Sequence, residues 1–176
     1  MGSLAYHSYS IARGLHWGAE LRTQRPPPTA DQIIPHFESN TLPNKALFLS
    51  SGGAAGDWVN ITNGYAHAVN RFTLDLLLKD KQFVNQWTAV PQTPSQIAEF
   101  WDNASRAMVR ISSQLAYMLT TPKGPSPGST WERVEFPELT KTDTKVTKIC
   151  RVNYIIASKT FEPPYKIWPL PETKQC

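Results

Sequence analysis

The sequence lacks the motifs that mark several common enzyme classes. It has only two cysteines among 176 residues, and neither CxxC nor any other zinc-ligand spacing is present. HExxH, GxGxxG and the phosphate-binding loop GxxxxGK[ST] are absent as well, and the one match to GxSxG, "GPSPG" at 124–128, lies in a Pro/Gly/Ser linker and not at the sharp strand-to-helix turn of a nucleophile elbow. These absences argue against metalloenzyme, nucleotide-kinase and serine-hydrolase functions, and we expect no bound metal.

Long apolar runs and a strong charge are also lacking. No segment reaches the roughly 18 apolar residues that a membrane-spanning helix needs. Charged residues make up 18% of the chain and the net charge is +4, with Lys and Arg spread along its length. This charge alone does not indicate nucleic-acid binding. No signal peptide is visible, but Met1-Gly2-Ser3 is compatible with an added start on a mature secreted protein, so secretion is the expectation.

The two cysteines leave two possibilities open. Cys150 and Cys176 form one disulfide that ties the tail to a late strand, or they remain free thiols as in a cytosolic protein. Two glycosylation sequons, at Asn60 and Asn103, would be used only in a secreted chain.

Aromatic residues and prolines, in contrast, are plentiful. The chain has 6 Trp, 6 Tyr, 7 Phe and 15 Pro, and 40% of its residues are apolar. A length of 176 residues favours a single domain, residues 1–176, with one core. The aromatic residues exceed what such a core requires, so some are expected to line a cleft.

The clearest predicted element is an amphipathic helix over residues 94–119. Thr93 and Gln96 form a capping box, Pro94 suits the first helical position, and apolar residues recur at three- and four-residue spacing. A second, short helix is predicted after Thr29, which can cap it.

Strands are predicted at 45–51, at 71–77 from its alternating pattern, and at 145–158. The segment that begins at Trp131 is interpreted as an acidic lead into this last strand. Residues 120–130 form a Pro/Gly/Ser linker, and the Pro-rich tail 161–176 is expected to be extended. The predicted fold is therefore α+β, one compact domain with two small β-sheets and flanking helices.

Three segments of the sequence, taken in order, indicate a possible function. They are "LRTQRPPPTADQI" (21–33), "ALFLSSGG" (46–53) and "WERVEFPELTKTDTKVTKICRV" (131–152). In this order they resemble the mono-ADP-ribosyltransferase toxins of the cholera and pertussis type. That family has an Arg on its first strand, an aromatic-x-Ser-Thr-Ser strand and a later catalytic Glu.

The resemblance implies NAD as the substrate and assigns roles to six residues. Arg22, with Arg25, would grip NAD, while Ser50 or Ser51 would position it. Glu132 would be the catalytic carboxylate, and Trp131, with Trp17 or Tyr65 as alternatives, could stack on the nicotinamide ring. Arg13 is a reserve for the first-strand Arg.

These residue types suit cleavage of the nicotinamide–ribose bond. The reaction develops positive charge on the ribose, and a carboxylate near the 2′-hydroxyl stabilises it. An Arg binds phosphate through two parallel hydrogen bonds. Thr130 stands where transferases that modify protein side chains have a second acidic residue, which argues against that transfer and favours NAD hydrolysis or transfer to another acceptor. The acceptor, a protein or a nucleic acid, stays open.

Two other functions compete with this one. The chain could be a secreted effector without catalytic activity that binds a partner through exposed aromatic residues. It could also be a small basic RNA-cleaving toxin, with His67 or His36 as general base and phosphate contacts from Lys141, Lys145, Lys148 and Arg151.

Overall fold

The computed structural model describes residues 25–50, 57–89, 92–173 and 175–176. Its strands are β1 (Leu42–Pro43), β2 (Ala46–Leu49), β3 (Ser112–Thr120), β4 (Val146–Ile155), β5 (Thr160–Phe161) and β6 (Tyr165–Trp168). Its helices are α1 (Ala30–Ile33), η1 (Ile34–His36), α2 (Trp58–Ala68), α3 (Leu74–Leu77), α4 (Lys81–Thr88), α5 (Pro94–Ile111), η2 (Trp131–Glu135) and α6 (Phe136–Leu139). The α+β class is confirmed.

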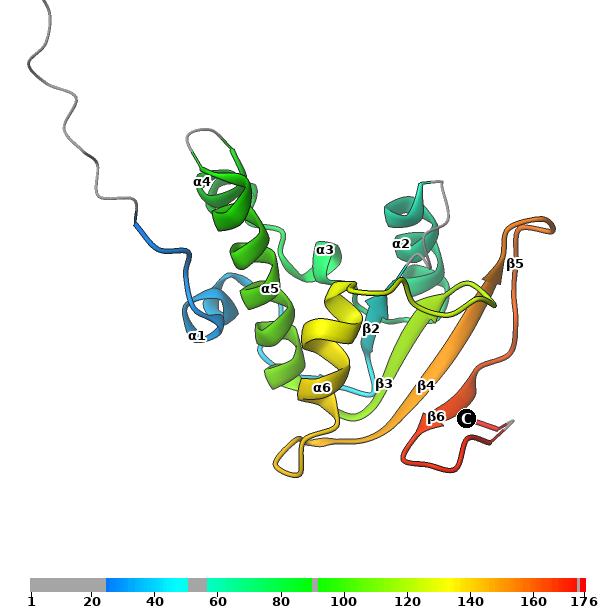
Figure 1. The fold of residues 1–176 in the computed structure, drawn as a ribbon. Helices are drawn as coiled ribbons and strands as arrows, with labels where there is room; N and C mark the ends of the chain where they lie inside the picture. Colours follow the sequence, from blue (N-terminus) through cyan, green and yellow to red (C-terminus); the bar gives the residue numbers. More distant parts are fainter. Residues whose placement is uncertain (1–24, 51–56, 90–91, 174) are drawn as a thin grey trace, which may run out of the picture.

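The described strands form one connected sheet of six strands, where two small sheets were predicted. Strand β3 is central: β1 and β2 pair in parallel with successive halves of it, and β4 runs parallel on its other side. Strands β5 and β6 pair antiparallel with β4. Because β2, β3 and β4 are parallel, their carboxyl ends meet at one edge of the sheet (Figure 1).

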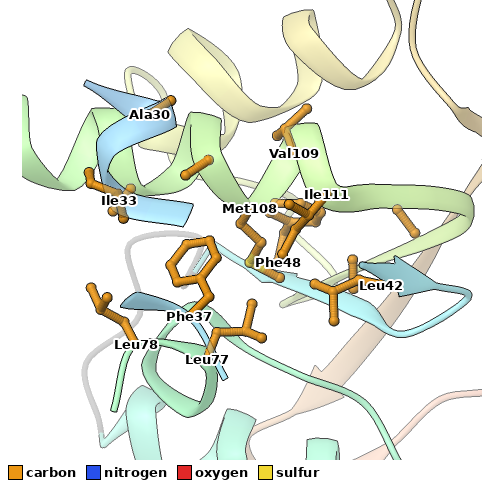
Figure 2. Close-up of a cluster of buried hydrophobic side chains, with 14 of the residues drawn as sticks. Ala30, Ile33, Phe37, Leu42, Phe48, Leu77, Leu78, Met108, Val109 and Ile111 are labelled. Atoms are coloured by element: carbon orange, nitrogen blue, oxygen red, sulfur yellow. The ribbon is translucent and has the colours of Figure 1, made fainter. Parts of the chain in front are cut away.

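Helices cover both faces of this sheet. Helices α5 and α6 lie on one side and α2 on the other (Figure 1). The larger core packs Phe48 of β2 and Met118 of β3 against Phe100 and Met108 of α5 (Figure 2). The smaller core, on the α2 side, packs Trp58 and Ala66 against residues of the three parallel strands: Leu47, Tyr117, Leu119, Cys150 and Val152.

The predicted long helix is correct at its start and too long at its end. Thr93 and Gln96 form the capping box, with Pro94 at the first position. The helix ends at Ile111, and Ser112 turns into extended backbone at the start of β3. A strand covered on both faces is apolar almost throughout, so the end of β3 imitates the spacing of a helix.

Two segments are helical that the sequence predicted otherwise, the first as an acidic lead into the last strand and the second as a strand. Residues 131–139 form η2 and α6, and β4 begins only at Val146. Their buried residues recur at helical spacing: Trp131, Val134, Glu135 and Leu139. In 71–77, Phe72 makes one isolated bridge to Ala46, and α3 follows because the Thr73 side chain accepts a hydrogen bond from Leu76 N.

The strand predicted at 45–51 and the short helix predicted after Thr29 are confirmed, and one of the two possibilities left open for the cysteines is observed. The strand predicted at 45–51 is β2, and the helix after Thr29 is α1, with a capping box to Gln32. Cys150 and Cys176 form a disulfide, with their Cα atoms 6.0 Å apart. The tail is thereby joined to β4, the strand that β6 also borders. No helix in the described ranges is long and apolar enough to span a membrane.

Candidate functional site

Polar residues gather at the carboxyl ends of the parallel strands. Ser50 directly follows β2, is buried, and donates its N–H to Leu119 O of β3 at 3.0 Å. Thr120 ends β3 and lies opposite Asn153 of β4. Ligands of sheets with helical connections commonly bind beyond these strand ends. This edge is therefore the place to look for a site.

A wide helical turn, η2, brings an acidic residue into the interior next to this edge. Phe136 N bonds to Trp131 O, the spacing of a π-turn. Pro137 explains the widening, because it has no N–H for the carbonyl of Arg133 and its ring would clash there. Such turns are frequent at functional sites. Glu135 is the last residue of η2.

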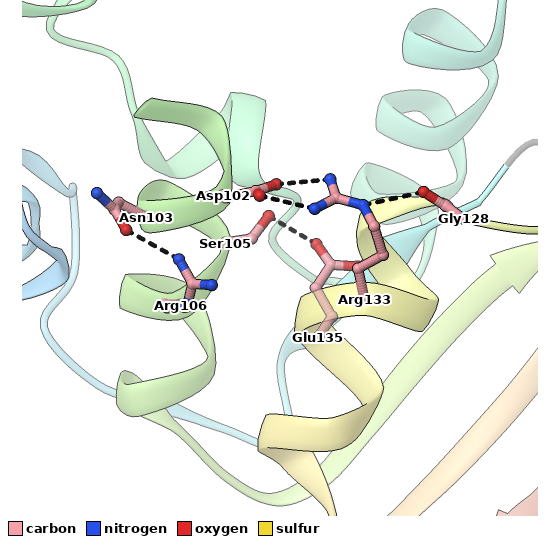
Figure 3. A network of polar contacts seen from close by, with 7 residues as sticks. All are labelled: Asp102, Asn103, Ser105, Arg106, Gly128, Arg133 and Glu135. Carbon is pink, nitrogen blue, oxygen red and sulfur yellow. Dashed lines mark hydrogen bonds and ion pairs between the residues drawn. The ribbon is translucent and has the colours of Figure 1, made fainter. Parts of the chain in front are cut away.

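Glu135 is the one carboxylate among the described residues that is classed as buried. Its exposed fraction is 6%, and its Oε1 accepts a hydrogen bond of 2.8 Å from Ser105 Oγ of α5 (Figure 3). Ser105 is itself 3% exposed. The other oxygen of Glu135, Oε2, has no hydrogen-bond partner within the part of the chain that the structure describes.

The environment of Glu135 changes its acidity. Its pKa is raised from 4.5 to about 7, chiefly by burial, because the ionised form loses its hydration. The Ser105 hydrogen bond acts in the opposite direction, and the negative charge of Asp102 raises the pKa further. A carboxyl group that changes charge near neutral pH is well suited to acid–base or charge-stabilising chemistry.

Arg133 and Glu132 hold the connection from β3 to η2. Arg133 forms two hydrogen bonds of 2.9 Å to the carboxylate of Asp102 and donates from Nε to Gly128 O at 3.0 Å (Figure 3). The hydrogen bonds to Asp102 and the negative charge of Asp102 both raise the pKa of Arg133. Glu132 Oε2 accepts from Gly128 N at 2.8 Å. The Gly128 residue is thus held at both its N–H and its carbonyl.

The same connection also reaches Ser50. Ser126 N donates to Ser50 Oγ at 3.1 Å, so the segment predicted as a Pro/Gly/Ser linker is attached to the end of β2. Ser129, in this connection, and Thr120 and Thr121, at the end of β3, each have a buried hydroxyl oxygen without a partner among the described residues. Buried polar atoms are nearly always paired, so unpaired ones here mark the edge as functionally interesting.

The structure brings three of the predicted site residues into this region. Ser50 lies at the end of β2, and Trp131 is buried against Phe48 and Phe136, with ring centroids 5.9 and 5.5 Å away. Glu132 is exposed on η2. Its proposed catalytic role stays a prediction, but its contact with Gly128 gives it a structural role as well.

Of the predicted arginines the structure describes Arg25, which is not part of this cluster. Arg25 lies over the ring of Trp87 in α4, 5.8 Å from its centroid, and lines a separate cavity with Phe83. Arg22, Arg13 and Ser51 lie outside the described residues.

The side chains named for RNA cleavage are largely engaged elsewhere. Lys141 pairs with Glu138, and Lys148 donates to Cys176 O at 2.9 Å. Arg151 donates to Thr121 O at 2.8 Å, among other contacts. His36 lies 3.0 Å from Asp80 and stacks on Phe83. In the described ranges, no group of three His, Cys, Asp or Glu side chains is arranged to hold a metal.

Glu135 is the residue that the sequence reasoning missed. It lies three residues after Glu132, in a segment that was interpreted as extended. A helix over this segment places Glu135 on the same buried face as Trp131 and Leu139. That spacing was the available signal, and Pro137 obscured it because proline normally interrupts helices.

Comparison with known proteins assigns no family. No protein-family model matches the chain, and no curated protein matches it. The chain is similar to a solved structure of a cyclase from Aplysia, in complex with its substrate NGD and product cGDPR, at 22% identity and a TM-score of 0.46. The match covers 68% of this chain and 51% of that chain, so it spans about half the length of the cyclase. A likeness of this size carries no argument about function.

Proposed function

We propose that this protein cleaves the bond between nicotinamide and ribose in NAD, with Glu135 as the carboxyl group that stabilises the transition state. The observation that carries the proposal is the buried Glu135, bound by Ser105 through one oxygen and unpaired at the other. The resemblance to ADP-ribosyltransferases in the order of Arg, Ser and Glu segments supplies the substrate.

The proposed reaction needs one well-placed negative charge. The C1′–N1 bond breaks, its electron pair neutralises the nicotinamide ring, and positive charge develops on the ribose. A carboxylate close to the 2′-hydroxyl stabilises that charge most effectively where water is excluded. An acceptor, either water or a nucleophilic group of another molecule, then attacks C1′ and loses its proton.

The raised pKa of Glu135 fits this role. A group with a pKa of about 7 is partly ionised at neutral pH. The nicotinamide ring of NAD carries a positive charge, which favours the ionised carboxylate when it binds nearby. Substrate binding would therefore complete the ionisation of Glu135, and the uncharged product would reverse it.

The neighbouring residues take supporting roles in this proposal. Ser105 orients the carboxyl group of Glu135, and Ser50 holds the β3–η2 connection through Ser126. Trp131 forms part of the apolar wall, while Arg22 remains the proposed residue for NAD phosphate. Glu132 remains a second candidate for the catalytic carboxylate.

The proposal includes a secreted toxin or effector that transfers ADP-ribose, with simple NAD hydrolysis as the alternative outcome. The disulfide between Cys150 and Cys176 supports secretion, because disulfides persist in oxidising compartments. The test is NAD turnover by the purified protein, with nicotinamide and ADP-ribose measured separately. Equal yields of the two indicate hydrolysis, and a deficit of free ADP-ribose indicates transfer. Absence of nicotinamide release and of NAD binding would favour the interaction protein without catalysis.

A further inference from the structure

A second cavity lies beside the proposed site, on the side where η2 and α6 face the C-terminal tail. Its volume is about 510 Å³, which is ample for a small organic molecule. Its lining includes three aromatic side chains, Trp131, Phe136 and Trp168, and the aliphatic Leu170 at its margin. Leu170 is 76% exposed, the highest value among the large hydrophobic residues that the structure describes as exposed.

The charge of the cavity is the second relevant feature. Glu132 and Glu172 both line it, and neither forms an ion pair with a described residue. Arg151 lines it too, but its guanidinium donates to the carbonyls of Thr121 and Pro122 and to Asn153 Oδ1. Two carboxylates thus stand beside aromatic walls in a protein whose net charge is +4.

We infer that this cavity binds an organic cation with apolar substituents, of the alkylated ammonium type. Aromatic faces attract such cations through their negative quadrupole, and a nearby carboxylate adds a Coulombic attraction. The lining sets two carboxylates against the one guanidinium of Arg151, so its net charge disfavours an anion, and an uncharged apolar ligand would gain nothing from that charge. The combination of Trp168, Glu132 and Glu172 therefore selects for positive charge as well as apolar surface.

This inference can be tested separately from the NAD proposal, although the cavity shares Trp131 and Glu132 with the residues named there. Glu135 and Ser105 are not among the residues that line the cavity, and binding can be measured without turnover. Failure to cleave NAD would leave the cation site intact, and failure to bind a cation would leave the NAD proposal intact.

The test uses choline and its uncharged isostere 3,3-dimethylbutan-1-ol, which have the same shape. Each is titrated into ¹⁵N-labelled protein while the indole N–H resonances of the 6 Trp residues are followed. We expect choline to shift the Trp168 resonance saturably and to bind about tenfold more tightly than the alcohol. Equal affinity for the two molecules, or no saturable shift with choline, would overturn the inference.

Two variants locate the site. Glu172→Gln, at an exposed position, should weaken choline binding by about three- to fivefold. Trp168→Leu should weaken it by about tenfold. Glu138→Gln is the matched control, since Glu138 pairs with Lys141 and does not line the cavity. Choline binding that is unchanged in both Glu172→Gln and Trp168→Leu would contradict the assignment.

Discussion

Ser105 of α5 donates a hydrogen bond of 2.8 Å to Glu135 at the end of η2, and both side chains are buried. This contact joins the long helix to the turn that precedes β4. It fixes one oxygen of the carboxyl group and leaves the other, Oε2, without a partner among the described residues. The first three predictions below follow from this pair and its surroundings.

Glu135 should make the stability of the protein depend on pH. Its pKa is raised from 4.5 to about 7, so the folded state holds the proton more tightly than the unfolded state. The free energy of unfolding should therefore fall as pH rises from about 4.5 to about 7, by about 3 kcal/mol for this group alone. Urea unfolding at pH 5 and pH 8 measures this change.

The matched variants separate Glu135 from other titrating groups. Glu135→Gln should lose its share of the pH dependence, because the amide does not titrate. Glu132→Gln should keep the slope of the wild type. An identical slope in the wild type and Glu135→Gln would show that Glu135 is not a buried titrating group.

Removal of the Ser105 hydroxyl should raise the pKa of Glu135 further. The hydrogen bond from Ser105 favours the ionised carboxylate and so lowers its pKa. In Ser105→Ala, the part of the pH–rate profile that reports ionisation of Glu135 should move to higher pH. Ser105→Thr keeps the hydroxyl and should restore the profile if it folds normally. A loss of rate at every pH with no shift would indicate a purely structural role for Ser105.

Arg133 should influence Glu135 through Asp102. The guanidinium forms two hydrogen bonds with Asp102, whose negative charge raises the pKa of Glu135. In Arg133→Gln this charge is no longer balanced, so the pKa of Glu135 should rise and Gly128 should lose one of its two contacts. Carboxyl ¹³C chemical shifts of Glu135 across pH measure the pKa. A pKa that stays the same or falls in Arg133→Gln would refute the coupling.

The disulfide should stabilise the tail against β4. Cys150 and Cys176 are 26 residues apart in sequence. Closing a loop of this length removes entropy from the unfolded chain that corresponds to about 3 kcal/mol. We expect reduction, or a Cys150→Ser/Cys176→Ser double variant, to lower the free energy of unfolding by about this amount. A double variant as stable as the wild type would mean that the bond does not form.

The sequence predicted those elements whose signals are local. The Thr93–Gln96 capping box located the start of α5, and the apolar residues before Ser50 located β2. The prediction failed at β3, because a strand buried on both faces lacks the alternation of apolar and polar residues. The apolar residues of β3 therefore looked like a continuation of α5. The boundary between α5 and β3 is set by tertiary packing, which local sequence signals do not report.

The candidate site was predicted only in its neighbourhood. The segment that starts at Trp131 was recognised as acidic and important, and Ser50 was placed beside it. Which glutamate points inward depends on the widened turn before Pro137, and no alternating pattern contains that information. The partner, Ser105, lies 30 residues away on another helix, so their contact exists only in the folded chain.

The most direct test of the account compares nicotinamide release from NAD by the wild type, Glu135→Gln and Glu132→Gln, each shown to be folded by circular dichroism. We expect turnover by the wild type, a loss of about a thousandfold in kcat in Glu135→Gln, and largely retained turnover in Glu132→Gln. Full turnover by Glu135→Gln, or none by the wild type, would contradict this expectation.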